Sequence, residues 1–249
     1  MITFEKKNYK CHIDWGYGGT LRAVNRKDII IIVDVLSFSS SVITAVNKGG
    51  RIYPCSKKEN AALMAKNFGG TVAVGRNDVP GKGKYSLSPL TFLSVNYNES
   101  IVLPSPNGST CTGYASTAEY VFAGALINAK ATAEKISELI TNTNLNLTII
   151  ACGERFNFSN EDGDLRFAVE DYLGAGAILS YLDFGKSAEA LVCESAFLNS
   201  KDNIKEIILN CESGVELKGK GFEKDIEFSA QLDLYDAVVI LENGYYKKL

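Results

Sequence analysis

The feature that most restricts the fold is a run of β-branched residues that ends at a carboxylate. The segment DIIIIVDVL, residues 28–36, has four successive isoleucines and reaches Asp34 without an intervening polar residue. A strand that is apolar at every position is typical of a sheet buried on both faces, as in parallel α/β folds. The serine-rich corner SFSSS and the helix-like VITAVNKGG follow. The segment therefore predicts a buried strand, a polar corner and a helix.

The same order of strand, polar corner and small-residue helix recurs twice. SIVLPS is followed by PNGST and CTGYASTAEYVFAGAL, and NLTIIACGE is followed by a longer loop and DLRFAVEDYLGAGAILSYL. Shorter strand candidates, RIYPC and TVAVG, flank the helix candidate NAALMAKNF. Alternating strands and helices predict a three-layer α/β/α fold with a mixed, largely parallel sheet.

The C-terminal third changes character without a linker of low complexity. KDNIKEIILN has the pattern of an amphipathic helix, and residues 226–249 read as one or two strands around an acidic turn. We expect one α/β domain over residues 1–249, with a smaller C-terminal subdomain from about residue 190 as the alternative.

Composition excludes several classes of protein. The net charge is -3, and no Lys/Arg stripe is present, so a nucleic-acid partner is not expected. No apolar run is long enough for a membrane span, and the N-terminus lacks the apolar segment of a signal peptide. We expect a cytoplasmic protein, with a homodimer as one option for its assembly.

Histidine and cysteine content limits the chemistry. The single histidine, His12, excludes a multi-histidine metal site and leaves little room for a histidine-based triad. The six cysteines form no CxxC pair, which indicates reduced, buried thiols. Carboxylates, hydroxyls, cationic side chains and a hard metal ion are left as candidate catalytic groups.

The three corners carry the candidate site, because ligands of open α/β sheets bind at the carboxyl ends of the strands. Asp34 ends the first strand, where an unpaired charge is costly. Ser39 and Ser40 follow it, and they either cap the helix or bind an anion at its N-terminus. Capping alone explains the serines well, whereas Asp34 favours a functional role.

The second corner contains Asn107, Gly108 and Ser109 between two prolines and a helix. Asn-Gly is typical of a tight turn, and the hydroxyls could contact an anion. Local sequence favours neither a plain turn nor a binding site. Arg76, directly after TVAVG, is a further candidate for an anionic ligand.

The third corner ends at Glu154, and Glu170 and Asp171 lie in the helix that follows. Carboxylates that converge from separate corners would form an oxygen-rich site suited to Mg²⁺. These features favour a small phosphorylated or carboxylated ligand with a divalent metal. A cysteine-nucleophile hydrolase that uses Cys152 is a weaker alternative.

Four stretches of the sequence resemble, in order and spacing, motifs of the 2-phosphosulfolactate phosphatase family: DVL with its serines, LPSPNGS, ACGE and FAVEDYLGAGAI. The tail GFEKDIEFSAQLDLYDAVVILENG is also similar, so the resemblance spans residues 30–245. It implies a Mg²⁺-dependent phosphatase that hydrolyses phosphate esters of small 2-hydroxycarboxylic acids, including 2-phosphosulfolactate in coenzyme M biosynthesis. With this resemblance, the expected catalytic residues are Asp34, Glu154 and Asp171. The expected metal ligands are Asp34, Glu154 and Glu170. The expected substrate-binding residues are Ser39, Ser40, Arg76, Asn107, Gly108 and Ser109.

Two positions depart from the motifs of the family. Ser37-Phe38 stand where the family has Arg-Ala, and Gly75-Arg76-Asn77 stand where it has a Gly-Glu-Arg loop. The alternative hypothesis is therefore an altered homologue that binds a small anionic ligand without turnover.

Overall fold

A mixed sheet forms the centre of the molecule. The computed structural model describes residues 9–160 and 163–249, and within these ranges nine strands form one sheet in the order β1-β7-β2-β6-β10-β11-β3-β5-β4. The strands are β1 (Cys11–Trp15), β2 (Ile29–Val33), β3 (Arg51–Cys55), β4 (Thr71–Val72), β5 (Ser100–Pro104), β6 (Val121–Gly124), β7 (Leu147–Ala151), β10 (Val239–Glu242) and β11 (Tyr245–Lys248). A separate antiparallel pair consists of β8 (Glu154–Asn160) and β9 (Gly163–Arg166).

The sheet contains two parallel blocks. One block is β1-β7-β2-β6 and the other is β3-β5-β4. The C-terminal hairpin β10-β11 lies between them, with β10 antiparallel to β6 and β11 antiparallel to β3. The last strands of the chain therefore join the two blocks.

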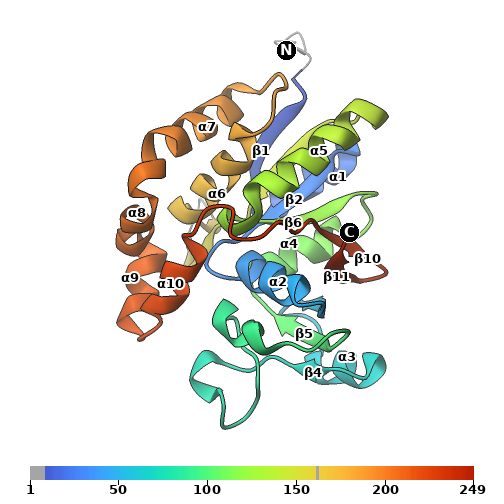
Figure 1. The fold of residues 1–249 in the computed structure, drawn as a ribbon, viewed down its shortest axis with the longest axis vertical. Helices are drawn as coiled ribbons and strands as arrows, with labels where there is room; N and C mark the ends of the chain where they lie inside the picture. Colours follow the sequence, from blue (N-terminus) through green and yellow to red (C-terminus); the bar gives the residue numbers. More distant parts are fainter. Residues whose placement is uncertain (1–8, 161–162) are drawn as a thin grey trace.

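Helices cover both faces of the sheet. The α-helices are α1 (Gly16–Arg26), α2 (Phe38–Asn47), α3 (Ala61–Phe68), α4 (Gly108–Ala115), α5 (Ala129–Thr143), α6 (Val169–Ser180), α7 (Ala188–Ser200), α8 (Ile204–Asn210), α9 (Glu212–Gly219) and α10 (Glu223–Ser229). Short 3-10 helices are η1 (Arg76–Asp78), η2 (Pro89–Ser94), η3 (Leu126–Asn128) and η4 (Lys201–Asn203). Figure 1 shows α2, α5 and α6 in front of the sheet and α1 and α4 behind it.

Strand β2 shows why both faces need a cover. Ile29, Ile31 and Val33 pack into the large apolar cluster shared with α2, α5 and α6, whereas Ile30 and Ile32 pack into a second cluster with α1 and α4. Successive side chains of a strand point to opposite faces, so an all-apolar strand requires an apolar layer on each side. The predicted three-layer α/β/α fold is confirmed.

Two helix predictions were wrong in part. The segment predicted as a helix over residues 111–126 ends its helix at Ala115, and Val121–Gly124 form β6, which is buried between β2 and β10. The predicted helix over residues 164–182 begins only at Val169, because Gly163–Arg166 pair with β8. In both cases, pairing with a distant strand overrides the local pattern.

The C-terminal helices α7 to α10 run along one side of the molecule, and α9 and α10 lie near the carboxyl end of the sheet (Figure 1). α7 packs against α6 and β1. In the described ranges, none of the helices combines the length and apolarity that a bilayer crossing requires.

Candidate active site

The loops that follow β2, β5 and β7 meet around a cavity of about 250 Å³. Asp34, Asn107 and Glu154 line this cavity, one from each predicted polar corner, and Arg76 joins them from the loop after β4. We call this space the acid cavity. The structure therefore brings together four of the residues that the sequence singles out.

Asp34 ties the first corner to the second. Its side chain is 5% exposed, its Oδ1 accepts the Phe38 N–H at 3.0 Å, and its Oδ2 accepts the Gly108 N–H at 2.9 Å. Amide donors stabilise the ionised carboxylate, but burial outweighs them, and the pKa of Asp34 rises to about 6. The charge of Glu170 adds to this rise.

Gly108 is required where the two corners touch. A Cβ atom at this position would lie 2.2 Å from the Phe38 ring. Only glycine allows the start of α4 to come close enough for its N–H to reach Asp34. This close approach explains why the Asn-Gly pair is more than a turn.

Asp171 ties the first corner to the third from behind the cavity. Its Oδ1 accepts the Val35 N–H at 2.8 Å, and its Oδ2 accepts the Gly153 N–H at 2.9 Å. Burial raises the pKa of Asp171 well above its usual range. Both oxygens of Asp171 accept hydrogen bonds from the backbone of the first and third corners, and the side chain does not line the acid cavity. Asp171 therefore has the geometry of a positioning residue.

Glu154 is the acid with the most freedom to exchange a proton. Its Oε2 accepts one hydrogen bond, from Asn107 Nδ2 at 2.9 Å. Burial, together with the charge of Asp34, raises the pKa of Glu154 to about 7. A carboxyl group with this pKa can give or take a proton near neutral pH.

The other predicted residues lie behind the cavity wall. The hydroxyls of Ser39, Ser40 and Ser109 donate to the carbonyls of Ile32, Val35 and Leu103, respectively. Glu170 is buried, and its Oε2 accepts the Cys211 thiol at 3.2 Å. These contacts hold the corners and α9 in place.

Arg76 supplies positive charge near the first corner. Its Nη2 donates to Ser37 Oγ at 2.8 Å and to the Leu87 carbonyl at 3.0 Å, and its Nε pairs with Asp225 at 3.1 Å. The family resemblance places an arginine at the position of Ser37. Here a guanidinium reaches that corner from another loop.

Sequence reasoning missed the part of the site that comes from α9 and α10. Ser213, Glu216, Leu217 and Lys220 line the acid cavity, and Asp225 of α10 holds both Arg76 and Ser88. Only Asp225 had a signal, as the acid of the GFEKDIEF tail quoted for the resemblance. Arg166 was also missed: it is 6% exposed and pairs with Glu212 and Glu216, which fixes α9 to β9.

The acid cavity offers a magnesium ion two carboxylates and one amide oxygen. Within residues 9–160 and 163–249, no group of three or more His, Cys, Asp or Glu side chains is arranged to hold a metal. Mg²⁺ usually takes only one or two protein carboxylates and completes its shell with water and phosphate oxygens. Asp34 and Glu154 meet that need, and Asn107 Oδ1 is a buried oxygen without a hydrogen-bond partner among the described residues.

Cys152 lies outside the acid cavity. The side chain is fully buried, and burial raises the pKa of its thiol well above the usual value. A nucleophilic cysteine needs access and a thiolate. The geometry therefore gives no support to the cysteine-hydrolase alternative.

Comparison with known proteins relates the sequence to one enzyme family. Residues 19–244 match the family described as 2-phosphosulpholactate phosphatase. A protein of Carboxydothermus hydrogenoformans named probable 2-phosphosulfolactate phosphatase is 30% identical over 217 residues, which is 84% of each chain. The 2-phosphosulfolactate phosphatase of Methanocaldococcus jannaschii is 28% identical over 226 residues, which is 89% of this chain and 90% of that one.

The match begins in α1 and ends at Gly244, so it covers the three corners, the residues of the acid cavity and β10, but not β11. It confirms the resemblance and, with it, the predicted enzyme class of phosphoric monoester hydrolase. The chain belongs to the 2-phosphosulpholactate phosphatase family.

Proposed function

We propose that this protein is a Mg²⁺-dependent phosphatase that acts on the phosphate ester of a small 2-hydroxycarboxylic acid. The observation that carries the proposal is the acid cavity, where Asp34 and Glu154 lie with Arg76 and Lys220 in about 250 Å³. The size of the cavity suits a compact substrate, and the names of the relatives make 2-phosphosulfolactate the first one to test. The cytoplasmic location, the homodimer and the role in coenzyme M biosynthesis stay predictions.

The metal would be held by Asp34 and Glu154, with Asn107 Oδ1 as a neutral oxygen ligand. When bound, Mg²⁺ neutralises phosphate charge and polarises the phosphorus–oxygen bonds. Two observations support this assignment. Asp34 and Glu154 line the same cavity, and Asn107 Oδ1 is buried without a partner among the described residues.

Glu154 would handle the proton of the reaction. A water oxygen forms a bond to phosphorus, the bond between phosphorus and the ester oxygen breaks, and the proton lost by water passes to Glu154. The departing ester oxygen takes a proton from solvent water and becomes the hydroxyl of the 2-hydroxy acid, inorganic phosphate is the other product, and Glu154 returns its proton to solvent.

Cationic side chains would orient the substrate. Arg76 is held by Asp225, Ser37 and Leu87, so its guanidinium has a fixed position at the cavity. Lys220 reaches the cavity from the end of α9, and it is exposed. We assign the phosphate to the side of Arg76 and Asn107, and the substrate carboxylate to Lys220.

The test is phosphate release from 2-phosphosulfolactate, 2-phospholactate and phosphoglycolate, each measured with Mg²⁺ and with EDTA. We expect turnover on at least one of these esters that EDTA abolishes and added Mg²⁺ restores. Absence of metal-dependent turnover on all three would contradict the proposal.

A second candidate function is binding of the same anions without turnover. Two observations favour it. Ser37 stands where the family resemblance places an arginine. Arg76 reaches this corner instead, but its ion pair with Asp225 neutralises part of the positive charge that it brings. Under this function, the esters would raise the melting temperature and be recovered intact after incubation. Hydrolysis of every stabilising ester would exclude it.

A further inference from the structure

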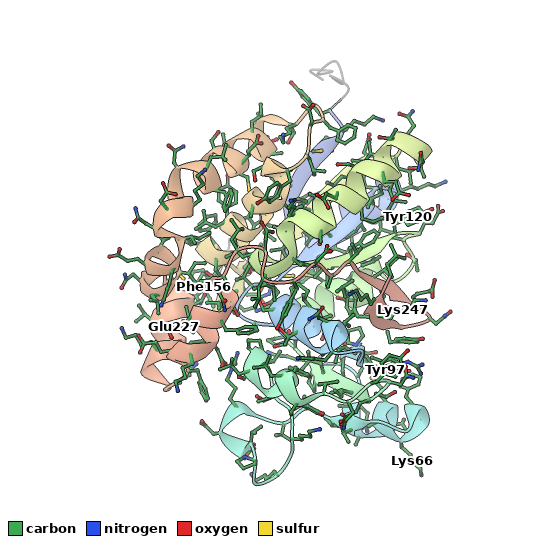
Figure 2. All side chains as sticks on the ribbon, viewed as in Figure 1. Lys66, Tyr97, Tyr120, Phe156, Glu227 and Lys247 are labelled. Atoms are coloured by element: carbon green, nitrogen blue, oxygen red, sulfur yellow. The ribbon has the colours of Figure 1, made fainter. Side chains whose placement is uncertain are left out.

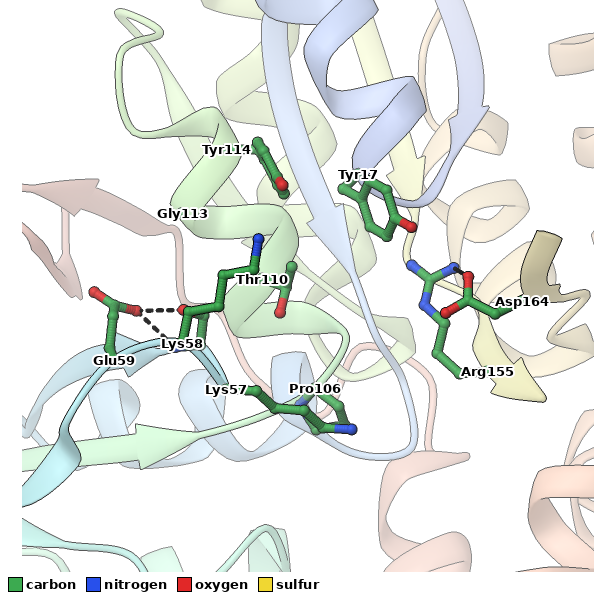
Figure 3. A pocket seen from close by; sticks show the side chains of 11 residues that line it. Tyr17, Lys57, Lys58, Glu59, Pro106, Thr110, Gly113, Tyr114, Arg155 and Asp164 are labelled. Atoms are coloured by element: carbon green, nitrogen blue, oxygen red, sulfur yellow. Dashed lines mark hydrogen bonds and ion pairs between the residues drawn. The ribbon is translucent and has the colours of Figure 1, made fainter. Parts of the chain in front are cut away.

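A second cavity lies beside the active site, and the proposed reaction does not use it. Its volume is about 630 Å³, and among the described residues it shares only Pro106 with the lining of the acid cavity. Its walls come from the start of α1, the loop after β3, Pro106 with the helix α4 that follows it, and residues of β8 and β9 (Figure 3).

Flat side chains form one wall of this cavity. The rings of Tyr17 and Tyr114 stack with centroids 5.6 Å apart, and the Arg155 guanidinium lies 4.7 Å from the centroid of the Tyr17 ring. Tyr17 and Tyr114 are 39% and 36% exposed, so ring surface is still accessible to a ligand. Aromatic and guanidinium planes of this kind bind other planar rings by stacking.

Positive charge exceeds negative charge around the same space. The described residues that line it include the cations Lys57, Lys58 and Arg155 against the acids Glu59 and Asp164. The Glu59 carboxylate accepts the Ser56 N–H and hydroxyl, both at 2.7 Å, which directs it toward its own loop (Figure 3). Asp164 lies 3.5 Å from Arg155 Nη1 and compensates part of that charge.

Arg155 also has an unused donor. Its side chain is 17% exposed, and Nη2 is a buried nitrogen without a hydrogen-bond partner among the described residues. A buried donor of this kind is costly unless a ligand or a water accepts from it. An anionic oxygen would satisfy it once the guanidinium turns from Gly16 toward the cavity.

From these observations we infer that the second cavity binds an anion that carries a planar ring, of the class of a nucleoside diphosphate. The ring would stack on the tyrosine–arginine wall, and the phosphates would take the charges of Arg155, Lys57 and Lys58. The volume of about 630 Å³ lies in the range of sites for ligands of this size.

The acid cavity is a poor competitor for the same ligand. Glu154 and Arg155 are consecutive residues of β8, so their side chains point to opposite sides of the strand. The acid cavity has a volume of only about 250 Å³, which is below the usual range of sites for ligands of this size. Because it also contains Arg76 and Lys220, variants of the second cavity decide which of the two cavities binds the ligand.

The experiment is calorimetric titration of the full chain in EDTA with adenosine diphosphate, pyrophosphate and adenosine as probes. We expect adenosine diphosphate to bind with one site per chain, and each of the two partial probes to bind at least roughly tenfold more weakly, because stacking and charge both contribute. Arg155→Met and Tyr114→Leu should each weaken binding of adenosine diphosphate by a similar factor.

Matched controls come from outside the cavity. Arg51 lies 5.6 Å from the Tyr245 ring, so Arg51→Met removes a comparable arginine–tyrosine contact. Tyr97, labelled in Figure 2, is 80% exposed and is not among the described residues that line the second cavity, so Tyr97→Leu controls for the loss of a tyrosine. Both control variants should bind adenosine diphosphate as the parent protein does.

Three results would overturn the inference: no binding of adenosine diphosphate, equal binding of pyrophosphate, or equal losses in the cavity variants and their controls. If Arg155→Met does not fold, a double change of the exposed Lys57 and Lys58 to alanine replaces it, and unchanged binding there would count against the site.

Discussion

At Glu154, burial and the neighbouring charge of Asp34 act together on one carboxyl group. They raise its pKa to about 7, although the hydrogen bond from Asn107 opposes the rise. Such an arrangement is costly for stability and useful for proton transfer, and residues of this kind are frequent at functional sites.

The first prediction concerns catalysis by Glu154. Glu154→Gln keeps the shape of the side chain and removes the exchangeable proton, so kcat should fall by roughly 10²- to 10⁴-fold. The measurement is phosphate release from the best of the three esters. Glu194→Gln is the matched control, since Glu194 is 17% exposed and pairs with Lys186 outside the acid cavity. Equal activity in the two variants would remove Glu154 from the mechanism.

The second prediction concerns the pH dependence of stability. The pKa of Glu154 is raised from 4.5 to about 7 and that of Asp34 from 3.8 to about 6, so the folded state binds protons more tightly than the unfolded chain. The free energy of unfolding in EDTA should therefore be highest near pH 4, fall as pH rises, and level off above pH 7. Glu154 should contribute roughly 2–3 kcal/mol to this fall.

Urea denaturation between pH 4 and pH 8 measures this slope. Mg²⁺ should stabilise the protein more at pH 8 than at pH 5, because the ionised carboxylates bind it. Glu154→Gln should flatten the decline. A free energy of unfolding that rises over this range would contradict the assigned shifts.

Single residues at the site were partly predictable. Asp34, Asn107 and Glu154 could be identified because each lies within three residues of the end of a buried strand, and such ends meet at one edge of a sheet. The roles of Ser39 and Ser109 could not be derived in the same way. Their hydroxyls bond to backbone carbonyls, and the partner of a hydroxyl is fixed only when the chain is folded.

Within single elements, helix α4 shows how one glycine sets the position of a whole helix. A Cβ at Gly108 would overlap the Phe38 ring, whereas a Cβ at Gly113 in the same helix meets no atom within 4 Å. The first glycine allows a close approach, and the second has no such packing role.

The third prediction uses this contrast. Gly108→Ala should destabilise the protein and lower kcat, because α4 must move away from Phe38 and its N–H then loses Asp34. Gly113→Ala should leave activity unchanged and stabilise by up to roughly 1 kcal/mol, as is typical of alanine in a helix. Thermal melting and steady-state kinetics of both variants give the test. Equal behaviour of the two would show that the contact with Phe38 is unimportant.

Elements with strong local patterns were predicted correctly, and those defined by distant partners were not. The apolar runs of β2, β5 and β7 match the structure, as do α2 and α3. The sequence predicts a helix at β6 because this strand has only four residues and is rich in small side chains. Only its pairing with β2 and β10 defines it as a strand. Apart from Asp225 in the tail quoted for the family resemblance, α9 and α10 have no local signal that directs them to the site.

For the whole molecule, the sequence indicated the layers of the fold but not the order of the strands. A mixed sheet follows from parallel-type runs combined with a C-terminal strand pair. The central place of β10-β11 does not follow, because it depends on contacts between residues more than 100 positions apart, such as Ile240 with Phe122. The shape of the acid cavity depends on equally distant contacts, such as Arg76 with Asp225.

The fourth prediction follows from this topology. A chain that ends at residue 236 lacks β10 and β11, so β6 and β3 lose the strands that join them. It also loses the buried side chains of Val239 and Tyr246. We expect loss of cooperative thermal unfolding and of activity, measured by calorimetry and phosphate release. A chain without only Leu249, which is 57% exposed, is the control and should behave as the parent. Cooperative unfolding of the shorter chain would contradict this account.

The central position of the C-terminal hairpin also bears on protein synthesis. A ribosome releases the chain from its first residue to its last, so both parallel blocks emerge before the strands that join them. Until the hairpin has been synthesised, each block has an open edge that can pair with another chain. A premature stop codon just before the hairpin would therefore leave a product that contains both blocks without the strands that join them and is prone to aggregate.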